Sequence, residues 1–115
     1  MAKKDIIKML NRALELEHAA RIQYLSHAEI VDGENSEPII ARLKDLASDE
    51  KGHEDKFRNL IGNFLGGVPS MKIAPVKEAK TIKEILKINL QAEKDAVDTY
   101  KKILEAINKE KDNLP

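Results

Sequence analysis

The sequence predicts an all-α protein in which three long helices form a bundle, with a long crossing between the second and the third. Glycine and proline, which often end helices, occur mostly in two short segments, 32–38 and 66–75. Outside these segments, apolar residues recur at alternating spacings of three and four, the period of helices packed side by side. The 115 residues, 42% of them hydrophobic, suffice for one domain with its own core.

The first helix is expected from about Asp5 to Val31, because no glycine or proline interrupts this stretch. We call the row of residues at three-four spacing the seam of a helix. The first seam has the apolar members Ile6, Leu10, Ala13, Ala20 and Val31, and the polar members Glu17, Tyr24 and His27. His18 is turned about 100° away from Glu17 and is therefore expected at the surface.

The second helix is expected to begin at Ser36, with Pro38 just inside its start, and to end at Gly66–Gly67. Its connection to the first helix is short, which favours an antiparallel hairpin. The second seam is also polar at its middle. Its apolar members are Ile39, Leu43, Leu46, Phe57, Leu60 and Phe64, and its polar members are Glu50 and His53.

The third helix is expected from Thr81, which has capping-box spacing to Glu84, to about Asn108. Its seam has the apolar members Ile82, Leu86, Ala96, Ile103 and Ile107, and the polar members Asn89, Glu93 and Tyr100. The crossing before this helix could span about 45 Å if extended. That length suffices to return along the bundle, so the third helix is expected to run parallel to the second.

The polar members of the three seams are expected at one level of the bundle. Glu17 faces Glu50 and His53 across the hairpin, and parallel helices bring Glu93 to the same height. Burying ionised carboxylates without partners costs on the order of several kcal/mol each, and no lysine or arginine occupies the seams. A bound cation resolves this conflict. Glutamate oxygens with an imidazole suit iron, manganese or, less selectively, zinc.

Composition excludes several other kinds of site. The chain has no cysteine, which rules out disulfides, thiolate-bound zinc, iron–sulfur clusters and a cysteine nucleophile. Twenty basic and twenty acidic residues cancel, so neither nucleic acid nor an anionic membrane is predicted as a partner. Lys8 and Arg12 interrupt the region where a signal peptide needs an unbroken apolar segment. A cytoplasmic location is expected.

An internal repeat relates the first and third helices. Glu17 is followed seven residues later by Tyr24, and Glu93 is followed seven residues later by Tyr100. This repeat indicates that one helical hairpin was duplicated. The first copy has its Glu-x-x-His motif, Glu50 and His53, after its glutamate. In the second copy, the same spacing would place the corresponding Glu-x-x-His motif beyond the end of the sequence.

With these motifs the whole chain resembles the first three of four helices of the ferritin-like di-iron carboxylate superfamily, as in bacterioferritins, ferritins and rubrerythrin-type proteins. The resemblance is carried by LNRALELEHAARIQYLSHAEI, SDEKGHEDKF and EILKINLQAEKDAV. It implies two irons per complete site, held by a glutamate from each of two helices and a Glu-x-x-His from each of the other two. It also implies oxidation of Fe(II) to Fe(III) by oxygen or peroxide, and iron storage in a hollow oligomer.

Carried over by position, Glu17 and His53 resemble terminal ligands of one iron. Glu50 resembles a bridge to the second iron, and Glu93 a terminal ligand of that second iron. The chain would thus supply part of the ligand set of a complete site.

The resemblance also covers the tyrosines and has two departures. Tyr24, and with less support Tyr100, would donate hydrogen bonds that orient the carboxylates for the reaction. Bacterioferritins bind haem through a methionine directly after the second helix's glutamate; Lys51 stands there, so no haem is expected. The fourth helix is missing, so residues 1–115 are expected to be a ferritin-like domain that ends before it. Ferroxidase activity is expected only if that helix or a second chain completes the site.

Two other interpretations stay open. In a metal-free helical interaction module, Glu50 and His53 would be a hydrogen-bonded pair in a polar layer that fixes helix register. In a shortened di-metal protein, two chains would share one site. All three interpretations predict association, expected here as a homo-oligomer, because three helices with a four-helix seam leave an apolar stripe uncovered.

Overall fold

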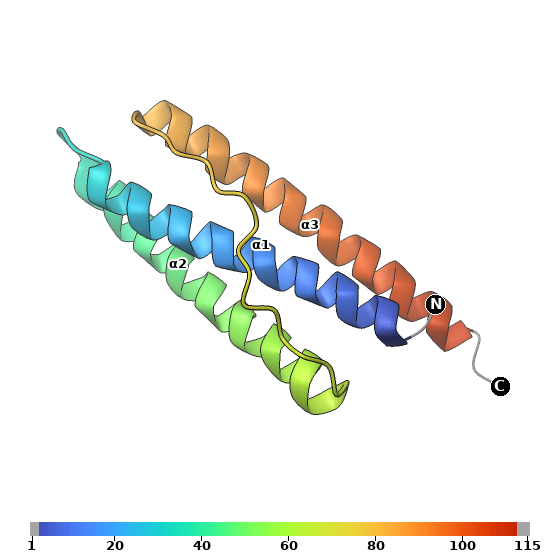
Figure 1. The fold of residues 1–115 in the computed structure, drawn as a ribbon. Helices are drawn as coiled ribbons and strands as arrows, with labels where there is room; N and C mark the ends of the chain where they lie inside the picture. The colour runs from blue at the N-terminus through green and yellow to red at the C-terminus, as the bar shows by residue number, and fades with distance from the viewer. Residues whose placement is uncertain (1–2, 113–115) are drawn as a thin grey trace.

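Three long helices make up the computed structural model of the chain, which describes residues 3–112, with side chains as far as residue 109 (Figure 1). They are α1 (Lys3–Ile30), α2 (Ser36–Asn59) and α3 (Ile82–Asp112), and a single π-helical turn, η1 (Leu60–Phe64), continues α2. No strand occurs between residues 3 and 112. The all-α prediction is confirmed.

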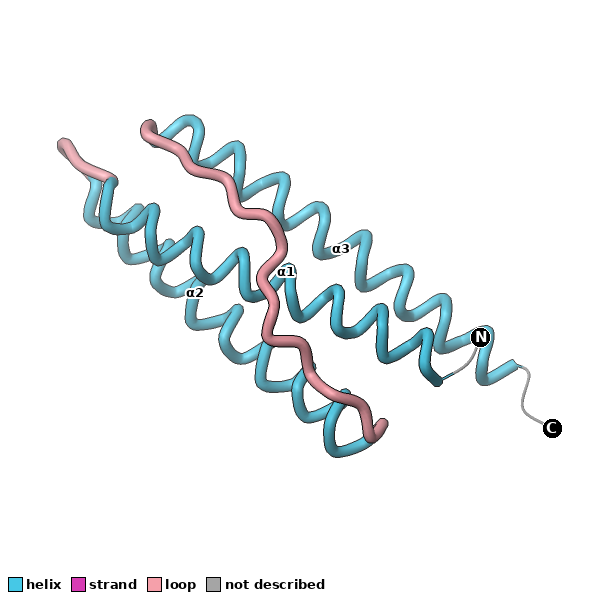
Figure 2. Tube along the Cα trace, in the orientation of Figure 1, coloured by secondary structure: helices cyan, strands magenta, loops and turns pink. Residues whose placement is uncertain are grey.

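Helix α1 packs against both α2 and α3 and runs antiparallel to them (Figures 1 and 2). The crossing after η1 passes in extended form over α1 and brings the chain back to the start of α3, so α2 and α3 are parallel as predicted. Within the described residues, the backbones of α2 and α3 do not come within 8 Å of each other between Cα atoms. A groove lies between these two helices on one side of α1, lined by Glu50 and His53 of α2 and by Glu93 and Val97 of α3.

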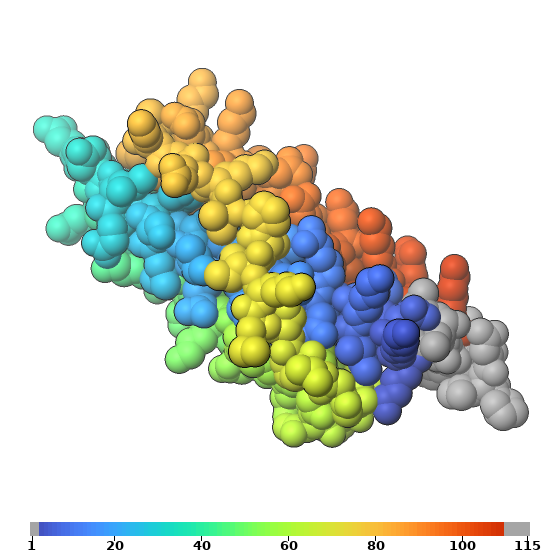
Figure 3. All heavy atoms as spheres, viewed as in Figure 1, coloured from blue at the N-terminus to red at the C-terminus, as the bar shows by residue number. Residues whose placement is uncertain are grey.

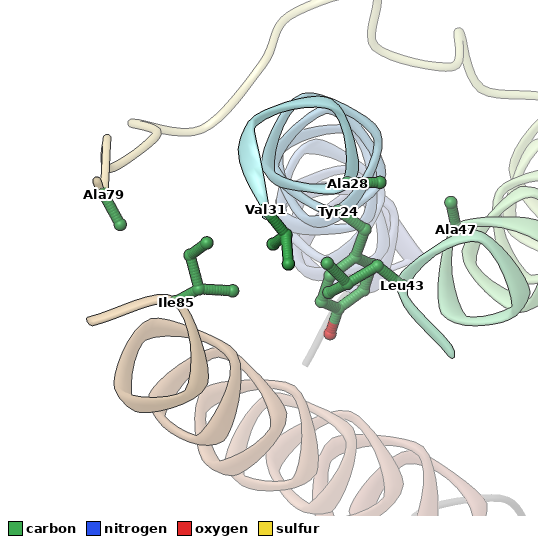
Figure 4. Packing of buried hydrophobic residues seen from close by; sticks show 7 residues of the cluster. All are labelled: Tyr24, Ala28, Val31, Leu43, Ala47, Ala79 and Ile85. Atoms are coloured by element: carbon green, nitrogen blue, oxygen red, sulfur yellow. The ribbon is translucent and has the colours of Figure 1, made fainter. Parts of the chain in front are cut away.

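Two clusters of buried side chains hold the bundle together, on either side of the polar level. One consists of Tyr24, Ala28, Val31, Leu43, Ala47, Ala79 and Ile85 (Figure 4). The other consists of Leu10, Ala13, Leu14, Ile61 and Ile103. The first cluster draws residues from all three helices, and the second draws them from α1, η1 and α3, so each end of the bundle has its own apolar core.

Helix ends and seams differ from the prediction in a few places. The residue before α2 is Asn35, in the left-handed conformation with φ 64°, and it forms no side-chain cap. At α3, Thr81 caps as predicted: its hydroxyl oxygen accepts from the Glu84 backbone N–H at 3.2 Å. The seam residues Leu86 and Phe64 are 55% and 73% exposed, since nothing among the described residues covers the groove.

Polar groups on α1 bind the extended crossing, which lies across this helix in the space-filling view (Figure 3). Without regular structure of its own, the crossing needs such partners for its backbone N–H and C=O groups. The α1 residues are Asn11, Glu15, His18 and Gln23, and they bind Val68, Ser70, Lys72, Ala74 and Lys77. These bonds fix the path of the crossing.

The crossing also explains why the prediction for His18 is wrong. We expected a surface histidine, but His18 is only 7% exposed because the crossing covers that side of α1. Its Nδ1 lies 2.7 Å from the backbone oxygen of Lys72. A carbonyl oxygen only accepts, so Nδ1 carries the proton, and Nε2 accepts from Nη2 of Arg58 at 2.8 Å.

Asn11 offers a direct test of the contribution of these bonds. Its side chain donates to the Val68 oxygen at 3.0 Å and accepts from the Ser70 N–H at 2.7 Å. We expect Asn11→Ala to lower the free energy of unfolding by about 1–3 kcal/mol, measured by urea denaturation. The control is Asn63→Ala, an exposed asparagine bonded to Asn59, with an expected change within about 0.5 kcal/mol. Equal losses in both variants would contradict this account.

Candidate metal centre

Three of the four predicted ligands come together between α1 and α2. Glu17 comes from α1, and Glu50 and His53 come from successive turns of α2, so that one ligand atom of each lies within 4.8 Å of the others. Nδ1 of His53 is 3.4 Å from Oε2 of Glu17 and 3.8 Å from Oε2 of Glu50. Two carboxylates and an imidazole thus face one point.

The carboxylate of Glu17 is the buried part of this group. Its side chain is 3% exposed, against 16% for Glu50 and 45% for His53. Oε1 of Glu17 accepts a hydrogen bond from the hydroxyl of Tyr100, whereas the buried Oε2 has no hydrogen-bond partner. Buried polar atoms are normally paired, so this free oxygen, aimed at the imidazole of His53, is suited to a cation.

Burial raises the pKa of Glu17 above its ordinary value of 4.5. The hydrogen bond from Tyr100 and the charge of His53 act in the opposite direction, and the charge of Glu54 adds to the effect of burial. The folded chain thus disfavours the ionised form of Glu17. A bound cation would reverse this preference.

Glu93, the fourth predicted ligand, lies outside this group of three. It is exposed to solvent on α3, although it lines the same cavity of about 350 Å³ as Glu17, Glu50 and His53. Its charge adds to the burial that raises the pKa of Tyr24 to about 12. The expected convergence of three helices is therefore incomplete: the backbone of α3 comes within 8 Å of α1 but not of α2 between Cα atoms, and Glu93 lies at the open side.

The two tyrosines of the repeat lie in different surroundings. Tyr24 is 1% exposed and packs in the core beside Leu43 (Figure 4). Tyr100 donates to Glu17, and its ring lies 5.8 Å from that of Phe57 between centroids.

A second polar cluster beside the centre was missed at the sequence level. Glu54, 1% exposed, accepts hydrogen bonds from Arg21 and from Nη2 of Arg58 at 2.9 Å, and Nε2 of His18 lies 3.6 Å away. Burial alone would raise the pKa of Glu54, but these hydrogen bonds outweigh it and lower the pKa. Only the spacing of four between Glu54 and Arg58 could have indicated part of this cluster.

Tyr100→Phe tests which tyrosine controls Glu17. Removing the donor should raise the pKa of Glu17 further, because its hydrogen bond favours the ionised carboxylate. The pKa can be followed by NMR titration of the Glu17 carboxyl carbon in the presence of a chelator. Tyr24→Phe is the matched control and should leave that titration in place. A larger shift with Tyr24→Phe would reverse the assignment.

Comparison with known proteins now adds to this geometry. Residues 7–114 match the ferritin-like domain of the ferritin family. The chain belongs to this family. Among the described residues, no helix has the length and apolar character needed to cross a membrane.

Two curated ferritin-like relatives show how much of a whole protein the chain represents. It is 31% identical over 105 residues to a bacterioferritin of Brucella melitensis, matching 90% of this chain and 65% of that protein. It is 31% identical over 98 residues to a bacterial ferritin of Neisseria meningitidis serogroup B, matching 84% and 62%. The chain therefore spans less than two thirds of the length of these relatives.

Solved structures of ferritin-like proteins share the fold. A ferritin-like, diiron-carboxylate protein from Bacillus anthracis superposes with a TM-score of 0.86 at 30% identity, covering 91% of this chain and 76% of that one. A Rhodobacter capsulatus bacterioferritin, described with a metal-free dinuclear site and haem iron, gives 0.83 at 27% identity, covering 95% and 68%. The predicted ferritin-like bundle is confirmed.

Proposed function

We propose that this ferritin-like protein binds iron at Glu17, Glu50 and His53 and, with the site completed by a further helix or a second chain, oxidises Fe(II) to Fe(III) for iron storage or detoxification. The observation that carries the proposal is Oε2 of Glu17, which is buried without a hydrogen-bond partner and lies 3.4 Å from an imidazole nitrogen beside a second carboxylate. The diiron-carboxylate description of the B. anthracis protein supports the choice of iron.

The residues present fit part of a two-iron site. Two carboxylates and an imidazole are the donors that iron and manganese accept. Glu17 and His53 would hold one ion, Glu50 would bridge, and Glu93 would hold the second from the open side of the cavity. Bound Fe(II) supplies the electrons that reduce oxygen or peroxide.

The chain's own groups prepare the centre for this role. Tyr100 engages Oε1 of Glu17 and leaves Oε2 as the free ligand atom. His53, 45% exposed, gives access from the groove side. With Lys51 exposed at the position of the bacterioferritin methionine, we propose a centre without haem.

The wider properties of the protein are part of the same proposal. Its substrates would be Fe(II) and oxygen or peroxide, and its working form a homo-oligomer in the cytoplasm, with no nucleic acid or membrane partner. Sharing of one site between chains is a second candidate, since Glu93 and His53 are both open to a further helix.

Aerobic addition of Fe(II) to the full chain tests the proposal. We expect Fe(II) to disappear faster than in buffer, with oxygen uptake and iron retained on the protein after gel filtration. Glu50→Ala should abolish the excess rate, and Glu105→Ala, an exposed glutamate far along α3, should not. If neither iron nor cobalt binds the wild-type chain, the metal-free interaction module becomes the better account.

A further inference from the structure

A cluster of polar side chains joins α1 to α2 directly beside the candidate metal centre. Along the chain, His18 follows Glu17 on α1, and Glu54 follows His53 on α2. Successive residues of a helix point about 100° apart, so these two neighbours face away from the cavity that Glu17 and His53 line. His18 bonds the crossing there, and its Nε2 lies 3.6 Å from Oε1 of Glu54. One level of the contact between α1 and α2 is therefore bridged on both sides.

Two arginines complete this cluster and bond across the helix contact. Arg21 of α1 donates to both carboxylate oxygens of Glu54, from Nε to Oε2 and from Nη2 to Oε1 at 3.2 Å. Arg58 of α2 donates from Nη2 to Oε1 of Glu54 at 2.9 Å and to Nε2 of His18 at 2.8 Å. Two-pronged bonds between an arginine and a carboxylate fix geometry as well as adding energy. We call these four residues, Arg21, Glu54, Arg58 and His18, the arginine clamp.

Stability alone gives a poor reason for the arginine clamp. The side chain of Glu54 is 1% exposed, whereas those of Arg21 and Arg58 are 35% and 40% exposed. Taking a carboxylate out of water is costly, and apolar residues of similar volume often stabilise a fold as well as a buried ion pair does. The best attested use of such a pair is to fix the register of packed elements. The arrangement that the clamp fixes is that of α1 against α2 at the level of the centre.

The spacing between Glu17 and His53 depends on that arrangement, because the two residues come from different helices. Oε2 of Glu17 lies 3.4 Å from Nδ1 of His53. Two ligand atoms that are each about 2.1 Å from one ion lie roughly 3.0–3.4 Å apart in octahedral and tetrahedral sites. The pair is thus spaced to hold one ion. Supporting residues must keep such a spacing to within about 0.5 Å, so a small slip of α1 past α2 would spoil it.

We propose that the arginine clamp positions Glu17 and His53 for metal binding, with Arg21 and Arg58 as positioning residues that are not ligands themselves. The inference rests on the proposed metal centre and adds how the spacing between its two helices is kept. Residues that orient metal ligands typically contribute about 10–100-fold in metal affinity. The clamp is expected to contribute within this range.

The charge of Arg21 allows positioning to be separated from electrostatics. A positive side chain near the centre repels a cation, so loss of its charge alone would leave metal affinity unchanged or increase it. Loss of positioning would decrease the affinity instead. The two accounts therefore predict different results for Arg21→Met, which removes the charge and the donors but keeps a long, unbranched side chain.

Co(II) binding to the full chain tests the proposal, with folding checked by far-UV circular dichroism. We expect Arg21→Met to bind Co(II) about tenfold or more weakly than the wild type. The visible spectrum of the bound ion should also change, because its ligand geometry changes. Arg21→Lys keeps the charge but loses the two-pronged bond, and should show an intermediate affinity. The matched control is Arg42→Met, which removes an exposed arginine elsewhere on α2 and should not weaken binding.

Unchanged or tighter Co(II) binding by folded Arg21→Met would overturn the proposal, even if urea denaturation showed the variant to be less stable. The proposed metal centre would survive that result, because the wild type would still bind Co(II). A wild-type chain that binds no Co(II) would instead remove the centre itself, and the positioning role with it. If Arg21→Met does not fold, Arg21→Lys decides in its place, and wild-type affinity with a wild-type spectrum would then count against the clamp.

Discussion

Changing Glu50 and His53 together to alanine is expected to weaken Co(II) and Fe(II) binding by about 100-fold or more. The expectation follows from their place in the centre: each offers a ligand atom within 4.8 Å of the others and of Glu17. Loss of groups that merely support ligands already costs about 10–100-fold in metal affinity, so loss of two ligands should exceed that range. Isothermal titration calorimetry, or the visible spectrum of bound Co(II), measures the change.

Thermal unfolding supplies a second readout of the same double variant. A ligand at about 100 times its dissociation constant stabilises a folded protein by about 2.7 kcal/mol, so added metal should raise the wild-type midpoint. The double variant should show no such rise, yet should unfold near the wild-type temperature without metal, because neither residue belongs to the two core clusters. Glu105→Ala should behave like the wild type. Unchanged Co(II) affinity in the double variant would remove the candidate centre.

Sequence spacing predicted the part of the centre that depends on position along one hairpin. Glu17 and the pair Glu50 and His53 lie at equal distances from one short turn, so their common height follows from chain geometry alone. Glu93 depends in addition on how α3 is rotated about its axis. That rotation is set by packing, which here puts Ile85 rather than Leu86 into the core and leaves Glu93 exposed.

The path of the crossing could not be predicted from spacing, and His18 shows the consequence. Periodicity places His18 off the seam of α1, which in a bare bundle means solvent. The extended crossing has no period to analyse, yet it covers His18 through the Lys72 carbonyl. Arg21 likewise has no sequence signal that links it to Glu54, because the two are 33 residues apart and meet only through the packing of α1 on α2.

Glu54→Gln is expected to lower the free energy of unfolding by about 2–3 kcal/mol. The amide cannot accept from both arginines as the carboxylate does, and hydrogen bonds to charged groups contribute about 1.5–3 kcal/mol each. Arg21 and Arg58 are 35% and 40% exposed, so water can partly replace the lost partner, which keeps the cost moderate. Urea denaturation measures it, with the exposed Asp55→Asn as the control.

The pH dependence of stability separates Glu54 from Glu17, because their pKa values move in opposite directions from 4.5. The contribution of Glu54, whose pKa is lowered, is complete above pH 4.5 and is lost as the pH falls through its folded pKa. The contribution of Glu17, whose pKa is raised, is complete below pH 4.5 and is lost as the pH rises through its folded pKa. In the presence of a chelator, Glu54→Gln should therefore reduce the pH dependence of the free energy of unfolding below pH 4.5. Glu17→Gln should reduce the pH dependence above pH 4.5. If metal is then added to the wild type alone, its free energy of unfolding above pH 4.5 should increase, since a cation stabilises the ionised form of Glu17 that burial disfavours.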